Sequence, residues 1–167
     1  NGEIYNYLEL KKKYFSSVNF KSTGDGEVIV HLYKKFGISF IQHIKGMFSI
    51  AISDEKKKKF FLIRDRFGIK PLYYNFNNSE LTFSSEIKGI LENNKIKKEV
   101  NYNEINNYLN YSKVNATNQT WFKNIYQLGS GEYLEFNKSN FTIKKYYNIE
   151  DHIDEESDYD TFKFHYY

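Results

Sequence analysis

The stretch that decides the fold class is Met47–Asp65, MFSIAISDEKKKKFFLIRD. Two short apolar runs, residues 47–54 and 60–65, lie on either side of a charged break. Their short length and their Ile and Phe content favour β-strands, and the charged break favours a hairpin. Lys56–Lys59 is therefore predicted to be a solvated hairpin tip. A phosphate-binding patch is the less favoured alternative, because no basic face with interleaved aromatic residues surrounds the lysines.

Further strands are predicted on the C-terminal side of this hairpin. Residues 69–76 and 80–85 form a second pair of apolar runs around Asn77-Asn78. Three more short strands are predicted within 120–138 and 141–150, with a glycine-containing turn between two of them. The chain thus carries several strands at hairpin spacing.

Apolar residues at helical spacing lie on both sides of the first hairpin. The clearest helix begins at Asp25 and ends at Gly37, with an apolar stripe at Val28, Ile29, Leu32, Tyr33 and Phe36. Shorter helices are predicted over Ile4–Tyr14, Ile38–Ile44, 85–93 (with Ser84 or Ser85 as its cap) and 101–112. Helices that precede hairpin-spaced strands, with little room for parallel crossovers, predict an α+β fold with an antiparallel sheet.

Composition excludes several classes of function. The chain has 167 residues, a formal net charge of +3 and no cysteine, so it has neither a disulfide framework nor a thiolate metal site. The four histidines form no H-x-x-x-H pair, which disfavours a metal centre. No run approaches the ~18 apolar residues of a membrane span. The small and scattered charge excess disfavours a nucleic-acid partner.

Two short segments carry candidate chemistry, and each has a structural alternative. Asn1-Gly2 is the favoured pair for a type I′ turn. The Asn1 side-chain amide and the main-chain N–H of the small residue Gly2 also suit an oxyanion hole. Asp25 can cap the helix that it begins. Because Gly24 and Gly26 leave it open on both sides, its carboxylate can instead bind a ligand ammonium.

Taken together, the segments NGEIYNY, STGDGEVIVHLYKKFG, IKGMFSIAISD, FFLIRDRFGIKPLYY, FSSEIKGIL and TWFKNIYQLGSGEYLEF resemble one family in order and spacing. It is the glutaminase domain of glutamine-dependent asparagine synthetases, a class II glutamine amidotransferase of the N-terminal-nucleophile type. The resemblance implies an αββα sandwich with mainly antiparallel sheets, incomplete at its N-terminus. It spans residues 1–147, and residues 148–167 are expected to be a linker toward a missing ATP-dependent synthetase domain.

The resemblance also implies a site for L-glutamine. Asn1 and Gly2 match the oxyanion-hole pair, and Asp25 matches the carboxylate that holds the α-ammonium group. Glu3 matches a glutamate that lines the pocket, and it is expected to do so by its backbone. Arg64 and Asp65 are predicted to be scaffold. No cofactor is expected in this chain, since ATP and Mg belong to the synthetase domain. That domain would use the released ammonia to convert aspartate to asparagine in the cytoplasm, and a homo-oligomer is compatible with this reading.

The sequence departs from the family in ways that bear on activity. The family nucleophile is an N-terminal Cys, and this chain has none. The first strands and a glutamine-gripping Arg lie upstream of NGEIYN in the family, and the synthetase signature Ser-Gly-Gly-x-Asp-Ser is absent here. The chain is therefore expected to be a fragment that does not hydrolyse glutamine by itself. The alternatives are an amidotransferase that acts on another acceptor and a degenerate, non-catalytic binding module.

Overall fold

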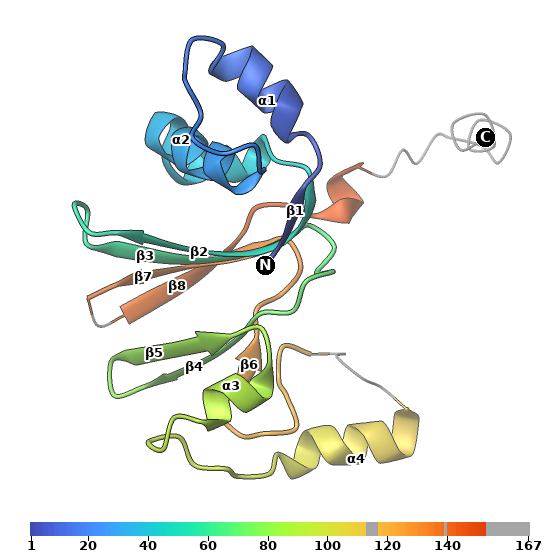
Figure 1. Cartoon of the computed structure of the whole chain (residues 1–167). Coiled ribbons are helices and arrows are strands. Elements are labelled where there is room, and N and C mark those ends of the chain that lie inside the picture. The colour runs from blue at the N-terminus through green and yellow to red at the C-terminus, as the bar shows by residue number, and fades with distance from the viewer. Residues whose placement is uncertain (113–116, 139, 153–167) are drawn as a thin grey trace, which may run out of the picture.

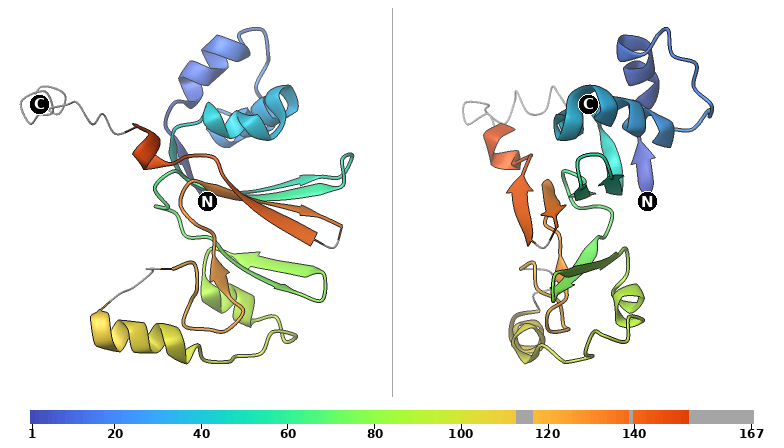
Figure 2. Two further views of the ribbon diagram at one scale, coloured as in Figure 1. Left: turned by 180° about the vertical axis from the view of Figure 1, so that it is seen from behind. Right: turned by 90° about the vertical axis from the view of Figure 1, so that its left-hand side faces the viewer.

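The computed structural model describes residues 1–112, 117–138 and 140–152, which form four layers (Figure 1). Two helices lie on the outer face of a five-stranded sheet, a three-stranded sheet lies beneath it, and two more helices form the far side. Figure 2 shows the same layers from behind and from the side. The helices are α1 (Tyr7–Tyr14), α2 (Gly26–Phe36), α3 (Ile87–Leu91) and α4 (Tyr102–Tyr111). The predicted αββα sandwich is confirmed.

The five-stranded sheet has the strand order β1-β2-β3-β7-β8, and all neighbouring strands are antiparallel. Its strands are β1 (Gly2–Ile4), β2 (Gly46–Asp54), β3 (Lys59–Arg64), β7 (Glu132–Asn137) and β8 (Asn140–Lys145). The predicted hairpin of Met47–Asp65 is confirmed, with Ser49 opposite Arg64 and Asp54 opposite Lys59. Lys59 is thus the first residue of β3, and the tip is Glu55–Lys58.

The three-stranded sheet has the order β5-β4-β6 and is also antiparallel. Its strands are β4 (Tyr73–Asn77), β5 (Glu80–Ser84) and β6 (Tyr126–Gln127). The prediction of a strand over 69–76 is wrong for its first four residues, which belong to the loop after β3. The Asp65 carboxylate accepts the main-chain N–H groups of Ile69 and Lys70, so these groups are satisfied without a neighbouring strand.

The central strand β3 is buried on both faces, and its side chains alternate between two cores. Phe61 and Ile63 pack into a core with α1 and α2, together with Val28, Leu32, Phe40 and Ile44. Leu62 packs between the two sheets with Leu72, Tyr74, Leu128 and Leu134. A third core, Ile90, Ile96 and Ile125, joins α3 to the second sheet. Continuous apolar runs such as FFLI are expected where a strand is covered on both sides.

The prediction of a helix over Ile4–Tyr14 is wrong for its first residues. Gly2–Ile4 is a strand, and α1 begins at Tyr7. Between them, the Asn6 side chain donates to the His43 carbonyl (2.9 Å) and accepts from the Lys45 N–H (2.9 Å), which ties the turn to the residues before β2. A type I′ turn at Asn1-Gly2 is likewise excluded, because Gly2 pairs with Phe48 in the sheet.

Other predicted elements differ in type or length. The helix predicted over Ile38–Ile44 is the 3-10 helix η1 (Gly37–Gln42). The three strands predicted within 120–138 and 141–150 are confirmed as β6, β7 and β8, although β6 has only two residues and β8 ends at Lys145. A second 3-10 helix, η2 (Ile149–His152), lies in the segment predicted as a linker. Residues 153–167 of that predicted linker lie outside the described residues.

Candidate functional site

The strand β1 presents a main-chain N–H group at the edge of the first sheet, where the described residues place no further strand. Asn1 and Ser49 exchange two hydrogen bonds, from Ser49 N to Asn1 O (2.8 Å) and from Asn1 N to Ser49 O (3.1 Å). In an antiparallel pair, such residues alternate with residues whose N–H and C=O groups point away from the partner strand. Gly2, opposite Phe48, is the next residue. Its N–H therefore points away from β2, toward the open side.

Glycine is required at this point of the strand. Gly2 has φ = 130°, and a Cβ atom built on it would overlap the carbonyl oxygen of Met47. Gly46, opposite Ile4, has φ = 154°, and its Cβ would overlap the carbonyl oxygen of Glu3. Residues with a side chain rarely adopt such φ values. The two glycines thus allow β1 and β2 to approach closely and fix the direction of the Gly2 N–H.

Asp25 lies on the same open side of β1. Ile4 is two residues after Gly2, so its N–H also points away from β2, and it donates to Asp25 Oδ2 at 2.7 Å. Asp25 is the residue before α2, but its side chain makes no capping hydrogen bond to that helix. The interpretation of Asp25 as a helix cap is therefore wrong. Its carboxylate joins the start of α2 to β1.

One oxygen of the Asp25 carboxylate is available to a ligand. Within the described ranges, the structure shows a hydrogen bond to Oδ2 and none to Oδ1. The flanking Gly24 and Gly26 leave open space, since a Cβ atom on either would meet nothing within 4 Å. Two residues along a strand span about 7 Å. The Gly2 N–H and the Asp25 carboxylate are therefore roughly this distance apart along the edge of β1. The separation suits a ligand with a carbonyl group at one end and an ammonium group at the other.

The Asn1 side chain extends the edge toward the second sheet. Asn1 Nδ2 donates to Ser85 Oγ at 3.3 Å, and a carboxamide has a second N–H that this bond does not use. Ser85 follows β5 directly, and the sequence pattern indicated it only as a candidate helix cap. In the structure, Glu86 is the N-cap residue of that helix, α3, and its side chain makes no capping hydrogen bond. The signal for Ser85 was its place in FSSEIKGIL, one of the segments that carry the family resemblance.

The four predicted site residues do not contribute in the same way. Asn1, Gly2 and Asp25 are brought together along the open edge of β1. Glu3 lies opposite Met47, and alternation along the strand directs its main-chain groups into the ladder with β2. The expectation that Glu3 lines the pocket by its backbone is therefore wrong, and the part of Glu3 that remains for a ligand is its exposed side chain.

Asp65 supports the site from the opposite side of β2. Its N–H donates to the Phe48 carbonyl (2.9 Å), and the Phe48 N–H donates to Asp65 Oδ2 (3.2 Å). Phe48 is the residue that faces Gly2. The fully buried Asp65 thus holds the segment of β2 on which β1 is built. This observation refines the prediction that Arg64 and Asp65 are scaffold.

The loop before Asp25 is held by Glu27. Its carboxylate accepts from Lys21 N (3.0 Å), Ser22 N (2.7 Å) and Ser22 Oγ (2.9 Å). The hydrogen bond from the Lys21 N–H is the largest cause that lowers the pKa of Glu27 to about 2, with the Ser22 bonds adding to it. From the other side, Lys11 Nζ donates to the Gly24 carbonyl at 3.2 Å. Together these bonds hold the loop that carries Asp25.

We expect the Glu27 carboxylate to make stability depend on acid pH. A pKa below the ordinary value of 4.5 means that the stabilisation is complete above about pH 4.5 and is lost as the pH falls toward 2. Thermal unfolding followed between pH 6 and 2 should show a smaller acid-induced fall in melting temperature for Glu27→Gln than for the parent chain. Glu80→Gln, in β5, serves as the control. Equal pH profiles for Glu27→Gln and the parent would contradict this role.

Metal-holding groups and membrane-spanning helices are both absent from the described part of the chain. Residues 1–112, 117–138 and 140–152 contain no group of three or more His, Asp or Glu side chains placed to hold a metal ion. No helix in these ranges has the length and apolar character to span a membrane.

The fold and the site define a glutamine amidotransferase domain. The sequence profile of that domain family matches residues 1–147, and the chain belongs to the family. Its fold is similar to two solved structures at 17% sequence identity and a TM-score of 0.61. One is the allosteric regulatory enzyme of purine biosynthesis, and the other is glutamine phosphoribosylpyrophosphate amidotransferase from Bacillus subtilis. Each comparison covers 88% of this chain and supports the fold alone.

Among relatives by sequence, the chain is similar to glutamine-hydrolysing asparagine synthetases. It is 45% identical over 157 residues to asparagine synthetase 2 of Bacillus subtilis, covering 90% of this chain and 21% of that protein. It is 39% identical over 148 residues to putative asparagine synthetase 2 of Methanocaldococcus jannaschii, covering 88% of this chain and 28% of that protein. The chain thus spans between a fifth and a third of the length of these relatives.

Proposed function

We propose that this chain forms the glutamine-binding part of the ammonia-supplying domain of an asparagine synthetase. The observation that carries the proposal is the shared edge of β1, where the Gly2 N–H and the Asp25 carboxylate point to the same open side. The similarity to glutamine-hydrolysing asparagine synthetases supports the choice of glutamine. In the longer protein, the ammonia would amidate aspartate in a separate domain that uses ATP and Mg.

The residues have distinct roles in this proposal. The Asp25 carboxylate binds the α-ammonium group of L-glutamine through Oδ1, while Oδ2 stays on the Ile4 N–H. The Gly2 N–H and the free N–H of the Asn1 carboxamide donate to the side-chain carbonyl oxygen. The hydrogen bonds from both donors become stronger when a nucleophile attacks that carbonyl, because its oxygen gains negative charge. Each such donor typically contributes a factor of about 10²–10³ to the rate. Glu3 lines the pocket with its side chain.

The proposed arrangement of the longer protein follows the same relatives. Residues 1–147 form the amidotransferase part, and residues 148–167 connect it to the ATP-dependent domain. The reaction takes place in the cytoplasm, and an epitope-tagged protein followed by cell fractionation tests that location.

Binding of L-glutamine to the purified chain tests the proposal. We expect saturable changes in the NMR amide signals of Gly2 and Ile4, with a dissociation constant in the millimolar range, or about −4 kcal/mol. D-Glutamine places its ammonium group differently and should bind more weakly. No glutamate should be released above background, because the sequence contains no Cys. Equal changes with both enantiomers, or no saturation, would refute the glutamine site, and clear turnover would refute the expected inactivity.

A further inference from the structure

The lysine run at the end of α1 contains one residue that differs from the other two. Lys12 and Lys13 are exposed, as is typical of cations near the negative end of a helix dipole. Lys11 is half-buried, and its Nζ lies 4.4 Å from the centre of the Phe20 ring and 5.2 Å from that of the Tyr7 ring. Such cation–π contacts hold an ammonium group over the ring faces. Lys11 is therefore directed toward the loop between α1 and α2.

The Lys11 ammonium group bonds to carbonyl groups of this loop. Nζ donates to the Gly24 carbonyl at 3.2 Å and makes a longer contact with the Ser22 carbonyl at 3.5 Å. The Ser22 N–H donates instead to the Glu27 carboxylate at 2.7 Å. Among the described residues, no carboxylate forms an ion pair with Lys11, so the loop carbonyls and the two rings are its partners. The loop is thus held between a cation of α1 and an anion of α2.

The bond to Gly24 acts on the peptide unit that leads into Asp25. The Gly24 carbonyl and the Asp25 N–H belong to one planar peptide unit, so a bond that fixes the carbonyl also fixes the orientation of that unit. The glycines on either side of Asp25 place few steric limits on the main chain. They are not restricted by packing either, because a Cβ atom on Gly24 or Gly26 would meet nothing within 4 Å. Lys11 therefore supplies a restraint that the neighbouring residues do not.

We propose that Lys11 is a positioning residue for the Asp25 carboxylate, an inference that rests on the proposed glutamine site. Lys11 does not touch glutamine. By holding the peptide unit before Asp25, it keeps Oδ1 directed to the open side of β1, where the α-ammonium group binds. Without this bond, Asp25 has the binding orientation in only a fraction of the chains, and the apparent affinity falls in proportion to that fraction. If Lys11 only packed α1 against the loop, its loss would lower stability and leave the affinity of the folded chain unchanged.

Substitution of Lys11 by methionine tests the proposal, because methionine keeps an apolar side chain of similar length and lacks the ammonium group. The NMR titration with L-glutamine should show about fivefold weaker binding for Lys11→Met, at a melting temperature close to that of the parent chain. Lys11→Arg keeps a positive charge and N–H donors, so it should restore most of the affinity.

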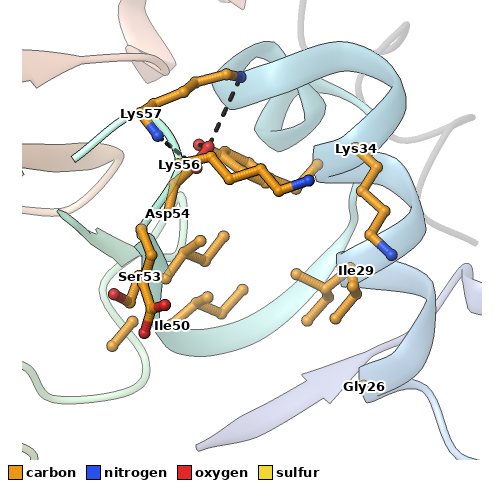
Figure 3. Close-up of a pocket in the computed structure, with 13 residues that line it drawn as sticks. Gly26, Ile29, Lys34, Ile50, Ser53, Asp54, Lys56 and Lys57 are labelled. Atoms are coloured by element: carbon orange, nitrogen blue, oxygen red, sulfur yellow. Dashed lines mark hydrogen bonds and ion pairs between the residues drawn. The ribbon is translucent and has the colours of Figure 1, made fainter. Parts of the chain in front are cut away.

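Lys34→Met is the matched control, since it removes the same charge from α2. Lys34 is exposed and lies beside the hollow between α2 and β2 (Figure 3). It is roughly 12 Å along the helix from Gly26, the residue that follows Asp25. Lys34→Met should bind L-glutamine as the parent chain does. A loss equal to that of Lys11→Met would show that net charge, and not the bond to Gly24, sets the affinity.

Two further measurements show whether Lys11 acts through Asp25. In the Asp25→Asn background, Lys11→Met should cause no further loss of affinity, because the charge that Lys11 positions is already absent. Without any ligand, the NMR amide signal of Ile4, whose N–H bonds to Asp25 Oδ2, should shift in Lys11→Met and return toward the parent position in Lys11→Arg.

Each outcome decides between the two claims. If the parent chain binds no L-glutamine, the proposed function fails, and the Ile4 signal alone decides the role of Lys11. If the parent binds, an unchanged affinity of Lys11→Met or an equal further loss in the Asp25→Asn background overturns the positioning role and leaves the glutamine site standing. An Ile4 signal that does not move overturns the role in either case. If Lys11→Met does not fold, Phe20→Leu, which removes the ring beside the ammonium group, is tested with the same expected signs.

Discussion

Replacing Asp65 by alanine is expected to destabilise the domain by about 4 kcal/mol, a large part of the 5–15 kcal/mol typical of folded domains. The Asp65 side chain is fully buried and accepts four main-chain N–H groups. Each buried donor that loses its acceptor costs about 1–3 kcal/mol, and water that enters the site offsets part of the sum. Urea unfolding monitored by circular dichroism measures the change.

The neighbouring Arg64 makes the effect of Asp65→Ala larger. Arg64 is also buried and donates to the carbonyl groups of Gly68, Lys70 and Leu128 at 2.6–2.9 Å. Burial lowers the pKa of the Arg64 guanidinium, while the adjacent Asp65 charge opposes that shift. Removing the carboxylate takes away the negative charge that does most to stabilise this cation. Glu9→Ala, at an exposed position of α1, should change stability by less than about 0.5 kcal/mol. A loss below 1 kcal/mol for Asp65→Ala would contradict the role of Asp65.

Replacing Asp25 by asparagine is expected to weaken L-glutamine binding by about 10- to 100-fold. A hydrogen bond to a charged group contributes about 1.5–3 kcal/mol, and each 1.4 kcal/mol is a tenfold change in affinity. The carboxamide of asparagine keeps an oxygen for the Ile4 N–H, which now bonds to Oδ2 at 2.7 Å. The substitution therefore removes the charge and leaves the link between β1 and α2 in place.

The Asp25→Asn effect is measured by the same NMR titration as for the parent chain. Glu80→Gln makes the equivalent change at an exposed position in β5 and should leave the affinity unaltered. The melting temperature of Asp25→Asn should stay close to that of the parent, which separates a loss of binding from a loss of fold. If Asp25→Asn binds glutamine as tightly as the parent, the ammonium group is bound elsewhere.

Where local pattern and tertiary packing agree, the sequence was a reliable guide. The hairpin of Met47–Asp65 and the helix from Gly26 to Phe36 are both as predicted, because their apolar residues repeat at the period of the element that they form. At Ile4 the two disagree. Its apolar side chain fits the helical spacing that follows, but pairing with Gly46 places it in a strand. Local pattern and tertiary packing also disagree at residues 69–72. The buried Asp65 and Arg64 side chains hydrogen-bond to main-chain groups of Ile69 and Lys70, which would otherwise need a neighbouring strand.

The sequence by itself determined the four-layer α+β class, the family and the identity of most candidate residues, because these depend on residue types, periodicity and motif order. Only the tertiary structure decided that Asp25 bonds to β1 and does not cap α2, and that Ser85 meets Asn1. These facts depend on contacts between residues far apart in the chain and on the register of β1 against β2. Local sequence patterns do not encode such long-range pairings directly.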